Sequence, residues 1–483
     1  RSAAGWILYE KSFDGCGISA LLQLNYGSME EKKMDKANVQ DDVLLLLDNY
    51  GQGSQSLHTS LKLAGYNGPA VVIEDDGFLP DGVTSVYGFF LGDFKKARGK
   101  KAQPRYFNEI TVPEYWEISG TNNNGKVQDL YRERGKIFYA EPRHKRLVRI
   151  VDWYDDKGNV RSSDHYNRYG ALYGRTIFNA KGQRINKSYF SAEGREVIVE
   201  NYVTGDIILN EGDEIRIFRN KTDFVLHFFV RAGFSQSRIF FNSLSTPFFV
   251  SNRLSAQVKR DVLFWQEPVG EEIPGNMQLI FRGEASRTAT VIAQSRAAYD
   301  KLLSLGARED MVKKLGFIYP FEKENTHRAE ALICTNSDNL EHGEEIIKAL
   351  PQMHFHIAAV TEMSSKLTGL GAYENVSLYP GVKPHILDEM FDKCDYYFDI
   401  NHESEIVSAV RQAFLHNQLI FAFQETLHNR ECVTEECIYP AGKAKQMIAD
   451  VRTAMSDGKA LEERLQSQRK AAMAETVKEY QNL

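Results

Sequence analysis

A group of polar residues follows an expected buried strand near residue 398, where open α/β sheets bind their ligands. Carboxylate, amide and imidazole side chains there could form hydrogen bonds with the hydroxyl groups of a sugar or peptide. The alternative left open is that two of them, Asn401 and His402, only cap the following helix. The group consists of Asp399, Asn401, His402, Glu403 and Glu405.

A second polar group ends an expected strand earlier in the chain. Trp265 and Gln266 close that strand, and Asn276 lies in the next segment. An aromatic ring beside amide groups suits a sugar or a serine-rich peptide, which needs an apolar platform and paired donors and acceptors. Burial of Trp265 in the domain core is the equally weighted alternative. The candidate binding residues are Trp265, Gln266, Asn276, Asn401, His402 and Glu405.

Residues 331–343, ALICTNSDNLEHG, have the pattern of a nucleotide-sugar-binding strand and turn before a helix at about 344–350. Retaining glycosyltransferases with two Rossmann halves place an Arg on this turn and a Lys at the helix start, which neutralise the donor diphosphate. The corresponding positions hold Asn336 or Ser337, and Glu341 or His342. A helix carboxylate that such enzymes also use is missing near 412–413. We therefore expect no donor turnover and no bound cofactor.

Two kinds of hydrophobic pattern predict the strands and helices that position these polar residues. Continuous apolar runs such as DVLLLL, followed by a Gly/Ser turn, a helix near 55–63 and the run AVVIE, predict parallel βαβ units. Between about 104 and 209 the pattern alternates, and Gly158, Gly170, Gly182 and Gly194 recur every twelve residues, which predicts an antiparallel meander.

The meander segment is rich in aromatic side chains. Some of them must form cross-strand pairs on its own faces, and the remainder favour a docking surface for another protein. The aromatic residues are Tyr115, Trp116, Tyr131, Tyr139, Trp153, Tyr154, Tyr166 and Tyr169.

The amino-acid composition further narrows the class of protein. With 483 residues, 42% hydrophobic and 26% charged, the chain is globular and should hold several domains. Its net charge of −6 argues against nucleic acid as a partner. The five cysteines lack paired spacing, which favours a reducing cytosol and no metal site. No apolar run is long enough to span a membrane, so we expect a cytoplasmic protein. Basic runs near 95–105 and 141–149 leave open a peripheral contact with an anionic membrane face or an acidic partner.

Several motifs together resemble one family. LFWQE, PGNMQ and DINH, with the meander inside the first half, are similar to the glycosyltransferase-stabilising subunit of the accessory Sec system of Gram-positive bacteria. The resemblance runs from about Val43 to Tyr439 and implies a GT-B type α/β fold of two Rossmann-like halves, with an antiparallel β-sheet inserted in the first. The predicted parts are residues 1–28, a cloning remnant or extension; 40–103 and 206–325, the first half; 104–205, the inserted meander; 326–440, the second half; and 441–483, a helical tail.

This resemblance implies a non-catalytic co-activator that forms a hetero-oligomer, a heterotetramer, with a catalytic glycosyltransferase. The pair would transfer GlcNAc from UDP-GlcNAc to Ser and Thr of serine-rich repeat adhesins before export, and the six candidate residues would bind this acceptor. One departure from the family is Glu403, where glycine is expected.

Two other functions remain open from the sequence. One is an active retaining glycosyltransferase that uses displaced basic residues such as Lys366 or Lys383. The other is a free-standing carbohydrate-binding or peptide-binding protein. The missing Arg and Lys argue against the first, and co-purification with an enzyme separates the second from the co-activator.

Overall fold

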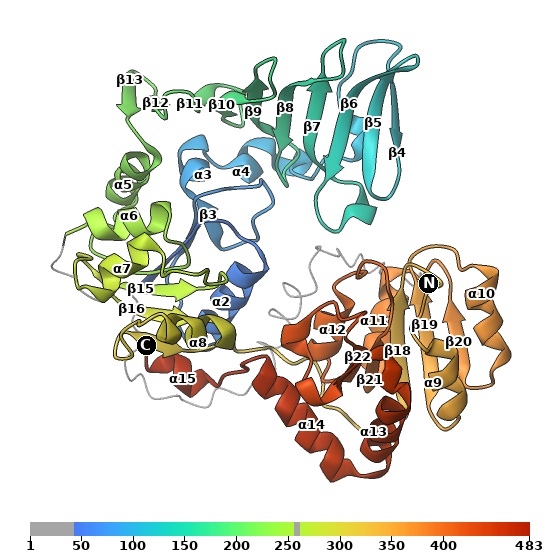
Figure 1. The fold of residues 1–483 in the computed structure, drawn as a ribbon. Coiled ribbons are helices and arrows are strands. Elements are labelled where there is room, and N and C mark those ends of the chain that lie inside the picture. Colours follow the sequence, from blue (N-terminus) through green and yellow to red (C-terminus); the bar gives the residue numbers. More distant parts are fainter. Residues whose placement is uncertain (1–42, 256–260) are drawn as a thin grey trace, which may run out of the picture. The chain divides into compact units, whose positions relative to one another are not determined.

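The computed structural model describes residues 43–255 and 261–483 (Figure 1). The predicted extension at 1–28 lies outside the described residues. The chain divides into two compact units. The first contains residues up to 292 together with 300–313, and the second contains 293–299 and 314–483.

A seven-stranded sheet forms the α/β part of the first unit. Its order is β17-β16-β15-β14-β1-β2-β3, and β1 pairs in parallel with both β14 and β2. All five residues of β1 are buried, as expected for a parallel strand covered on both faces. The strands are β1 Val43–Leu47, β2 Ala70–Val72, β3 Val83–Ser85, β14 Arg238–Phe241, β15 Asp261–Trp265, β16 Thr288–Ala293 and β17 Val312–Lys314. The helices are α2 Gln52–Leu63, α3 Val86–Leu91, α4 Phe94–Arg98, α5 Lys221–Ala232, α6 Thr246–Arg253, α7 Gly275–Phe281 and α8 Arg296–Ser304.

The rest of the first unit is a ten-stranded antiparallel meander in which each strand pairs with its sequence neighbour. The four glycines spaced by twelve residues lie in its turns with φ between 72° and 81°, a region that glycine adopts without strain. The strands are β4 Glu117–Gly120, β5 Asn124–Asp129, β6 Arg132–Tyr139, β7 Val148–Tyr154, β8 Val160–Tyr166, β9 Leu172–Phe178, β10 Arg184–Phe190, β11 Glu196–Asn201, β12 Ile207–Glu211 and β13 Glu214–Phe218.

The meander continues past the predicted boundary at residue 205. The hairpin β12–β13 turns at Gly212, which has φ 73°, and pairs with β11 in the same sheet. The local sequence alternates in the same way as the preceding strands, and the return to α/β structure comes only with α5.

Buried polar and aromatic groups fasten the meander to the α/β part of the first unit. The rings of Tyr87 on α3 and Tyr189 on β10 stack with centroids 4.4 Å apart. The Glu200 carboxylate accepts a hydrogen bond from the Tyr87 hydroxyl at 3.2 Å and forms an ion pair with Lys221 at 3.0 Å. Removal of the meander would therefore leave Tyr87 and Lys221 without these partners.

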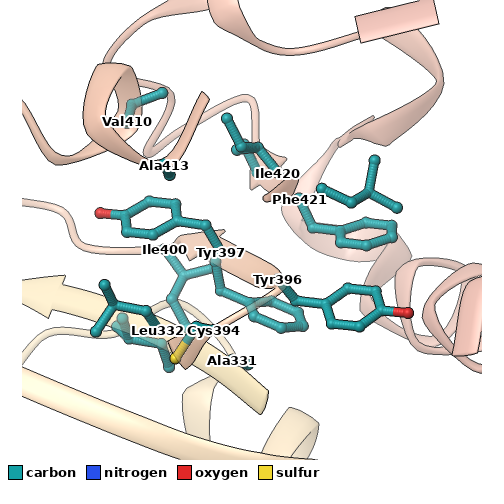
Figure 2. Close-up of a cluster of buried hydrophobic side chains, with 14 of the residues drawn as sticks. Ala331, Leu332, Cys394, Tyr396, Tyr397, Ile400, Val410, Ala413, Ile420 and Phe421 are labelled. Carbon is teal, nitrogen blue, oxygen red and sulfur yellow. The ribbon is translucent and has the colours of Figure 1, made fainter. Parts of the chain in front are cut away.

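The second unit is built on a six-stranded parallel sheet of order β20-β19-β18-β21-β22-β23. Figure 2 shows part of its core, where Leu332, Tyr397 and Phe421 pack with their neighbours. The strands are β18 Glu330–Thr335, β19 His354–Ala359, β20 Val376–Tyr379, β21 Tyr396–Asp399, β22 Leu419–Phe423 and β23 Ile438–Tyr439. The helices are α9 Gly343–Ala349, α10 Ser365–Thr368, α11 Pro384–Lys393, α12 Ala409–Leu415, α13 Ala444–Ser456, α14 Gly458–Ala471 and α15 Val477–Gln481. The predicted α/β class with an antiparallel sheet is confirmed, and the pairing of two halves as in the GT-B type stays a prediction.

The charged segment before β18 is packed into the second unit. The Asp395 carboxylate is fully buried and accepts hydrogen bonds from Lys323 Nζ at 2.6 Å and from the Arg328 backbone N–H at 2.8 Å. Although burial alone would raise its pKa, these donors lower the pKa of Asp395 to about 2. The segment thereby fixes the amino end of β21, the strand that carries the candidate site.

Candidate functional site

The candidate site of the second unit lies beyond the carboxyl ends of β18 and β21. Strand order reverses between these two strands, and open α/β sheets bind their ligands at such a point. The loop after β18 spans residues 336–342, and the loop after β21 spans 400–408. In this structure the two loops bond to each other. Leu340 and Asn401 form an antiparallel bridge, the Glu341 N–H donates to Ile400 O at 2.8 Å, and the His402 N–H donates to Asn339 O at 3.2 Å.

The Asn401 side chain ties the two loops together. It is 2% exposed, and its Oδ1 accepts hydrogen bonds from the hydroxyls of Thr335 at 2.8 Å and Ser337 at 3.0 Å. Its Nδ2 donates to Asn336 Oδ1 at 3.2 Å and to Glu403 O at 3.0 Å. These bonds use both lone pairs and both donors of the amide. Asn401 therefore holds the loops in place.

Glu341 and His342 are the two residues at which the sequence analysis expected a cation for the donor diphosphate, and Glu341 is acidic. Its carboxylate contacts His402 Nε2 at 2.5 Å and His342 Nε2 at 3.3 Å. Helix α9 begins after His342 and adds Glu344 and Glu345 in its first turn. Carboxylates at this position repel a diphosphate, so electrostatics and loop closure both disfavour a nucleotide donor.

His428 is a site residue that the sequence analysis missed. Its Nδ1 lies 2.6 Å from Asp399 Oδ1 and its Nε2 lies 2.6 Å from Glu403 O. Both partners are acceptors, so each ring nitrogen carries a proton and the ring is an imidazolium. The hydrogen bond with Asp399 raises the pKa of His428 to about 9. The sequence feature that could have identified His428 is its position in the segment after β22, at the same sheet edge as Asp399.

Glu405 acts within the same loop. Its Oε1 accepts a hydrogen bond from the Val410 N–H at 2.8 Å, at the start of α12. Burial raises the pKa of Glu405, and the nearby Asp399 raises it further. Asn401, His402 and Glu405 are thus brought together on one loop, and of the three the His402 ring is the one open to a ligand at a side-chain exposure of 28%.

The other three candidates belong to the first unit, beside the reversal point between β14 and β1. Gln266 Nε2 donates to Gly53 O at 3.0 Å, and Gln266 Oε1 accepts from Asn242 Nδ2 at 3.2 Å. Asn276 Nδ2 donates to Leu244 O at 2.9 Å. Both amides therefore hold the loop after β14, where Asn242 is a further polar residue that the sequence analysis missed.

Trp265 packs inside the first unit. Its side chain is buried, with the residue 4% exposed. The ring accordingly belongs to the core at the end of β15, which is the alternative that the sequence analysis weighed equally.

The basic residues of the enzymatic alternative lie on neighbouring elements of the second unit. Lys366 is on α10 and Lys383 precedes α11, and both are exposed. Asp338 in the closed loop accepts a hydrogen bond from the Ser364 hydroxyl at 2.9 Å, so a further carboxylate stands at the start of α10. Within residues 43–255 and 261–483, no group of three or more His, Cys, Asp or Glu side chains is arranged to hold a metal ion.

Together, the parallel α/β sheets, the separate antiparallel sheet and the polar sheet edges define a glycosyltransferase-like protein, and its usual donor position is closed and acidic. Four family models match successive parts of the chain. They are the GtfB N-terminal domain at residues 44–90, the GtfB middle domain at 116–219, the GtfB third domain at 221–305 and the GftB/GlyA-F C-terminal domain at 331–468.

Full-length relatives identify the family. The UDP-N-acetylglucosamine–peptide N-acetylglucosaminyltransferase stabilizing protein GtfB of Streptococcus agalactiae is 42% identical over 408 residues, which cover 84% of this chain and 91% of the relative. The protein of the same name from Streptococcus gordonii is 40% identical over 442 residues, covering 91% and 97%. The crystal structure of a GtfA/B complex bound to UDP and GlcNAc matches with a TM-score of 0.86 at 39% identity, covering 91% of this chain and 98% of that chain. The chain belongs to the GtfB family of glycosyltransferase-stabilizing proteins, which confirms the resemblance of its motifs.

Among the helices of the described residues, none has both the length and the apolar character that crossing a bilayer requires.

The charged state of His428 makes the stability of the second unit depend on pH. The folded-state pKa of about 9 lies above the usual 6.5, so this stabilisation is fully present below pH 6.5 and is lost as pH rises through 9. We expect His428→Gln to lower the free energy of unfolding by roughly 1–3 kcal/mol at pH 6 and by much less at pH 9.5. Urea unfolding of both proteins across this range measures the difference. A loss that stays constant from pH 6 to 9.5 would contradict the ion pair with Asp399.

Proposed function

We propose that this chain is the non-catalytic, stabilising subunit of a protein O-GlcNAc transferase complex. In this complex a catalytic partner uses UDP-GlcNAc, and this chain helps to bind the serine-rich repeat acceptor before export. The observation that carries the proposal is the closed edge of the six-stranded sheet. The Leu340–Asn401 bridge joins the two loops at the strand reversal, and Glu341 and His342 lie where the sequence analysis expected a cation for the donor diphosphate.

The first test is donor binding by the isolated chain. Without an Arg or Lys at the closed edge, the diphosphate of UDP-GlcNAc lacks charge-assisted hydrogen bonds there, so we expect no saturable binding at this edge below millimolar concentration and no release of UDP. Calorimetry and a UDP-release assay measure the two quantities. Micromolar binding that Lys366→Gln with Lys383→Gln abolishes would instead support the active-enzyme alternative.

The meander has two outer strands, β13 and β4, and we further propose that the β13 edge docks the catalytic partner. Strand β13 is the last strand of the sheet, so one side of its backbone is unpaired (Figure 1). Ile215 and Ile217 lie on one face of this strand and are 69% and 62% exposed. An exposed apolar edge strand favours association with another protein. On the opposite face, Phe218 packs on Phe224 of α5 with ring centroids 5.5 Å apart, which supports the strand.

Point substitutions test this surface better than deletion, because deletion of the meander would strip the partners from Tyr87 and Lys221. We expect Ile215→Lys with Ile217→Lys to abolish co-purification with the catalytic subunit, since two buried unpaired charges cost several kcal/mol. Leu130→Lys is the matched control, because Leu130 is 81% exposed on the distant β5–β6 hairpin of the same sheet. Pull-down of the partner measures the effect. If Leu130→Lys alone abolishes co-purification, the interface lies at the other end of the sheet.

For the acceptor, we propose that the six predicted residues have three roles. Gln266, Asn276, Asn401 and Glu405 hold loops, Trp265 supports β15 from the core, and His402 offers a partly exposed imidazole. A serine-rich segment has little apolar surface and high chain entropy, so it needs many weak hydrogen bonds along preformed loops.

We expect His402→Ala to weaken binding of the unmodified repeat by about three- to tenfold, the effect of one hydrogen bond, and to leave the complex with the catalytic subunit intact. His385→Ala is the control, because His385 is exposed on α11 of the same unit. Fluorescence anisotropy of a labelled repeat and pull-down on one preparation measure both quantities. Unchanged repeat affinity would place the acceptor elsewhere.

A further inference from the structure

A basic pocket lies in the second unit, apart from the closed sheet edge. Its volume is about 350 Å³, within the range of roughly 300–1,000 Å³ that ligand pockets occupy. Four basic side chains line it from three separate elements: Arg296 begins α8, Lys314 ends β17, and Arg469 and Lys470 lie in the last turn of α14. Helix α8 and strand β17 are divided between the two units, and Arg296 and Lys314 belong to the parts that group with the second. The remaining lining residues are Gln466, Met473, Ala474 and Glu475.

The floor of this basic pocket is held by backbone bonds. Phe317 and Ala474 form a parallel bridge, in which the Phe317 N–H donates to Met473 O at 3.1 Å and the Glu475 N–H donates to Phe317 O at 2.9 Å. A Cβ at Gly316 would lie 2.0 Å from Met473 O, so this close approach requires glycine. The Tyr480 hydroxyl on α15 donates to Gly316 O at 2.5 Å. The basic side chains therefore converge on a fixed frame.

Within the described residues, three of the four basic side chains of the pocket have no ion-pair partner. Arg469 forms an ion pair with Glu324 at 3.8 Å, donates from Nη2 to Asn417 Oδ1 at 2.9 Å, and places its guanidinium over the Phe321 ring. Within the described part of the chain, Arg296, Lys314 and Lys470 have no carboxylate as an ion-pair partner. Glu475, the acidic lining residue, accepts a hydrogen bond from the Gly316 N–H at 3.0 Å. Burial and the nearby Glu479 raise the pKa of Glu475, which weakens its repulsion of an anion.

We propose that this basic pocket binds a small anion that carries a phosphate or diphosphate group. Like charges that converge in a concave site repel one another, and a multivalent anion relieves that repulsion. Lysine ammonium groups bind phosphate as point charges, and an arginine adds a planar fork of donors. The volume suits a diphosphate and is too small for a folded partner. The site shares no residue with the closed edge, so it goes beyond the proposed function and does not depend on it.

Titration of the full chain with inorganic pyrophosphate tests the proposal. We expect saturable binding at one site, weakened by added NaCl because the contacts are ionic. Lys314→Gln with Lys470→Gln should weaken the binding by about tenfold or more. Lys459→Gln is the matched control, since Lys459 lies on the same helix with its side chain 84% exposed and outside the pocket. Equal melting temperatures of the three proteins show that the substitutions leave the fold intact.

Two further ligands distinguish the sources of the phosphate. UDP presents a nucleoside diphosphate, and vesicles of phosphatidylglycerol present a lipid headgroup. Binding of pyrophosphate or UDP that depends on Lys314 and Lys470 supports the proposal. Three results would overturn it. Neither pyrophosphate nor UDP binds saturably, the double variant binds them with the affinity of the unchanged protein, or only vesicle binding depends on the two lysines. Binding that survives in the double variant would point to the closed edge instead and would count against the proposed function separately.

Discussion

The closed edge of the second unit depends on the buried Asn401 amide. This side chain is bonded to the end of β18, to the loop that follows β18 and to its own loop, so it fixes the geometry of both loops at the strand reversal. A buried amide with a missing partner costs about 1–3 kcal/mol, and opening the loops for a nucleotide would break several of these bonds at once. The arrangement that joins the two loops therefore opposes the opening that a nucleotide donor would require at this edge.

Charge reinforces this closure. Glu341 contacts the imidazoles of His342 and His402, and Asp399 is balanced by the imidazolium of His428. The two loops contain no Arg or Lys that could bind an incoming diphosphate. Within the described residues, three cations without an ion-pair partner, Arg296, Lys314 and Lys470, lie instead in the basic pocket beside α14.

The sequence predicted the elements better than their contacts. The run VLLLL in β1 and the twelve-residue spacing of Gly158 to Gly194 determine parallel and antiparallel strands through local hydrophobicity and turn geometry. The missing cations, at Asn336 or Ser337 and at Glu341 or His342, were also visible in the sequence. In contrast, the partners of Asn401 and His428 lie up to 66 residues away and depend on strand order. The exposure of His402 and the burial of Trp265 likewise follow from packing, which a linear pattern does not contain.

Hydrogen exchange at the two amides that close the sheet edge tests the central claim most directly. The Glu341 N–H donates to Ile400 O and the His402 N–H donates to Asn339 O, so peptides that cover these residues report whether the loops stay joined. The account predicts strong protection in the isolated chain and no change at these two amides when millimolar UDP-GlcNAc is added. Weak protection without ligand, or a donor-dependent change at these two amides, would show that the loops open to bind a nucleotide and would contradict the account.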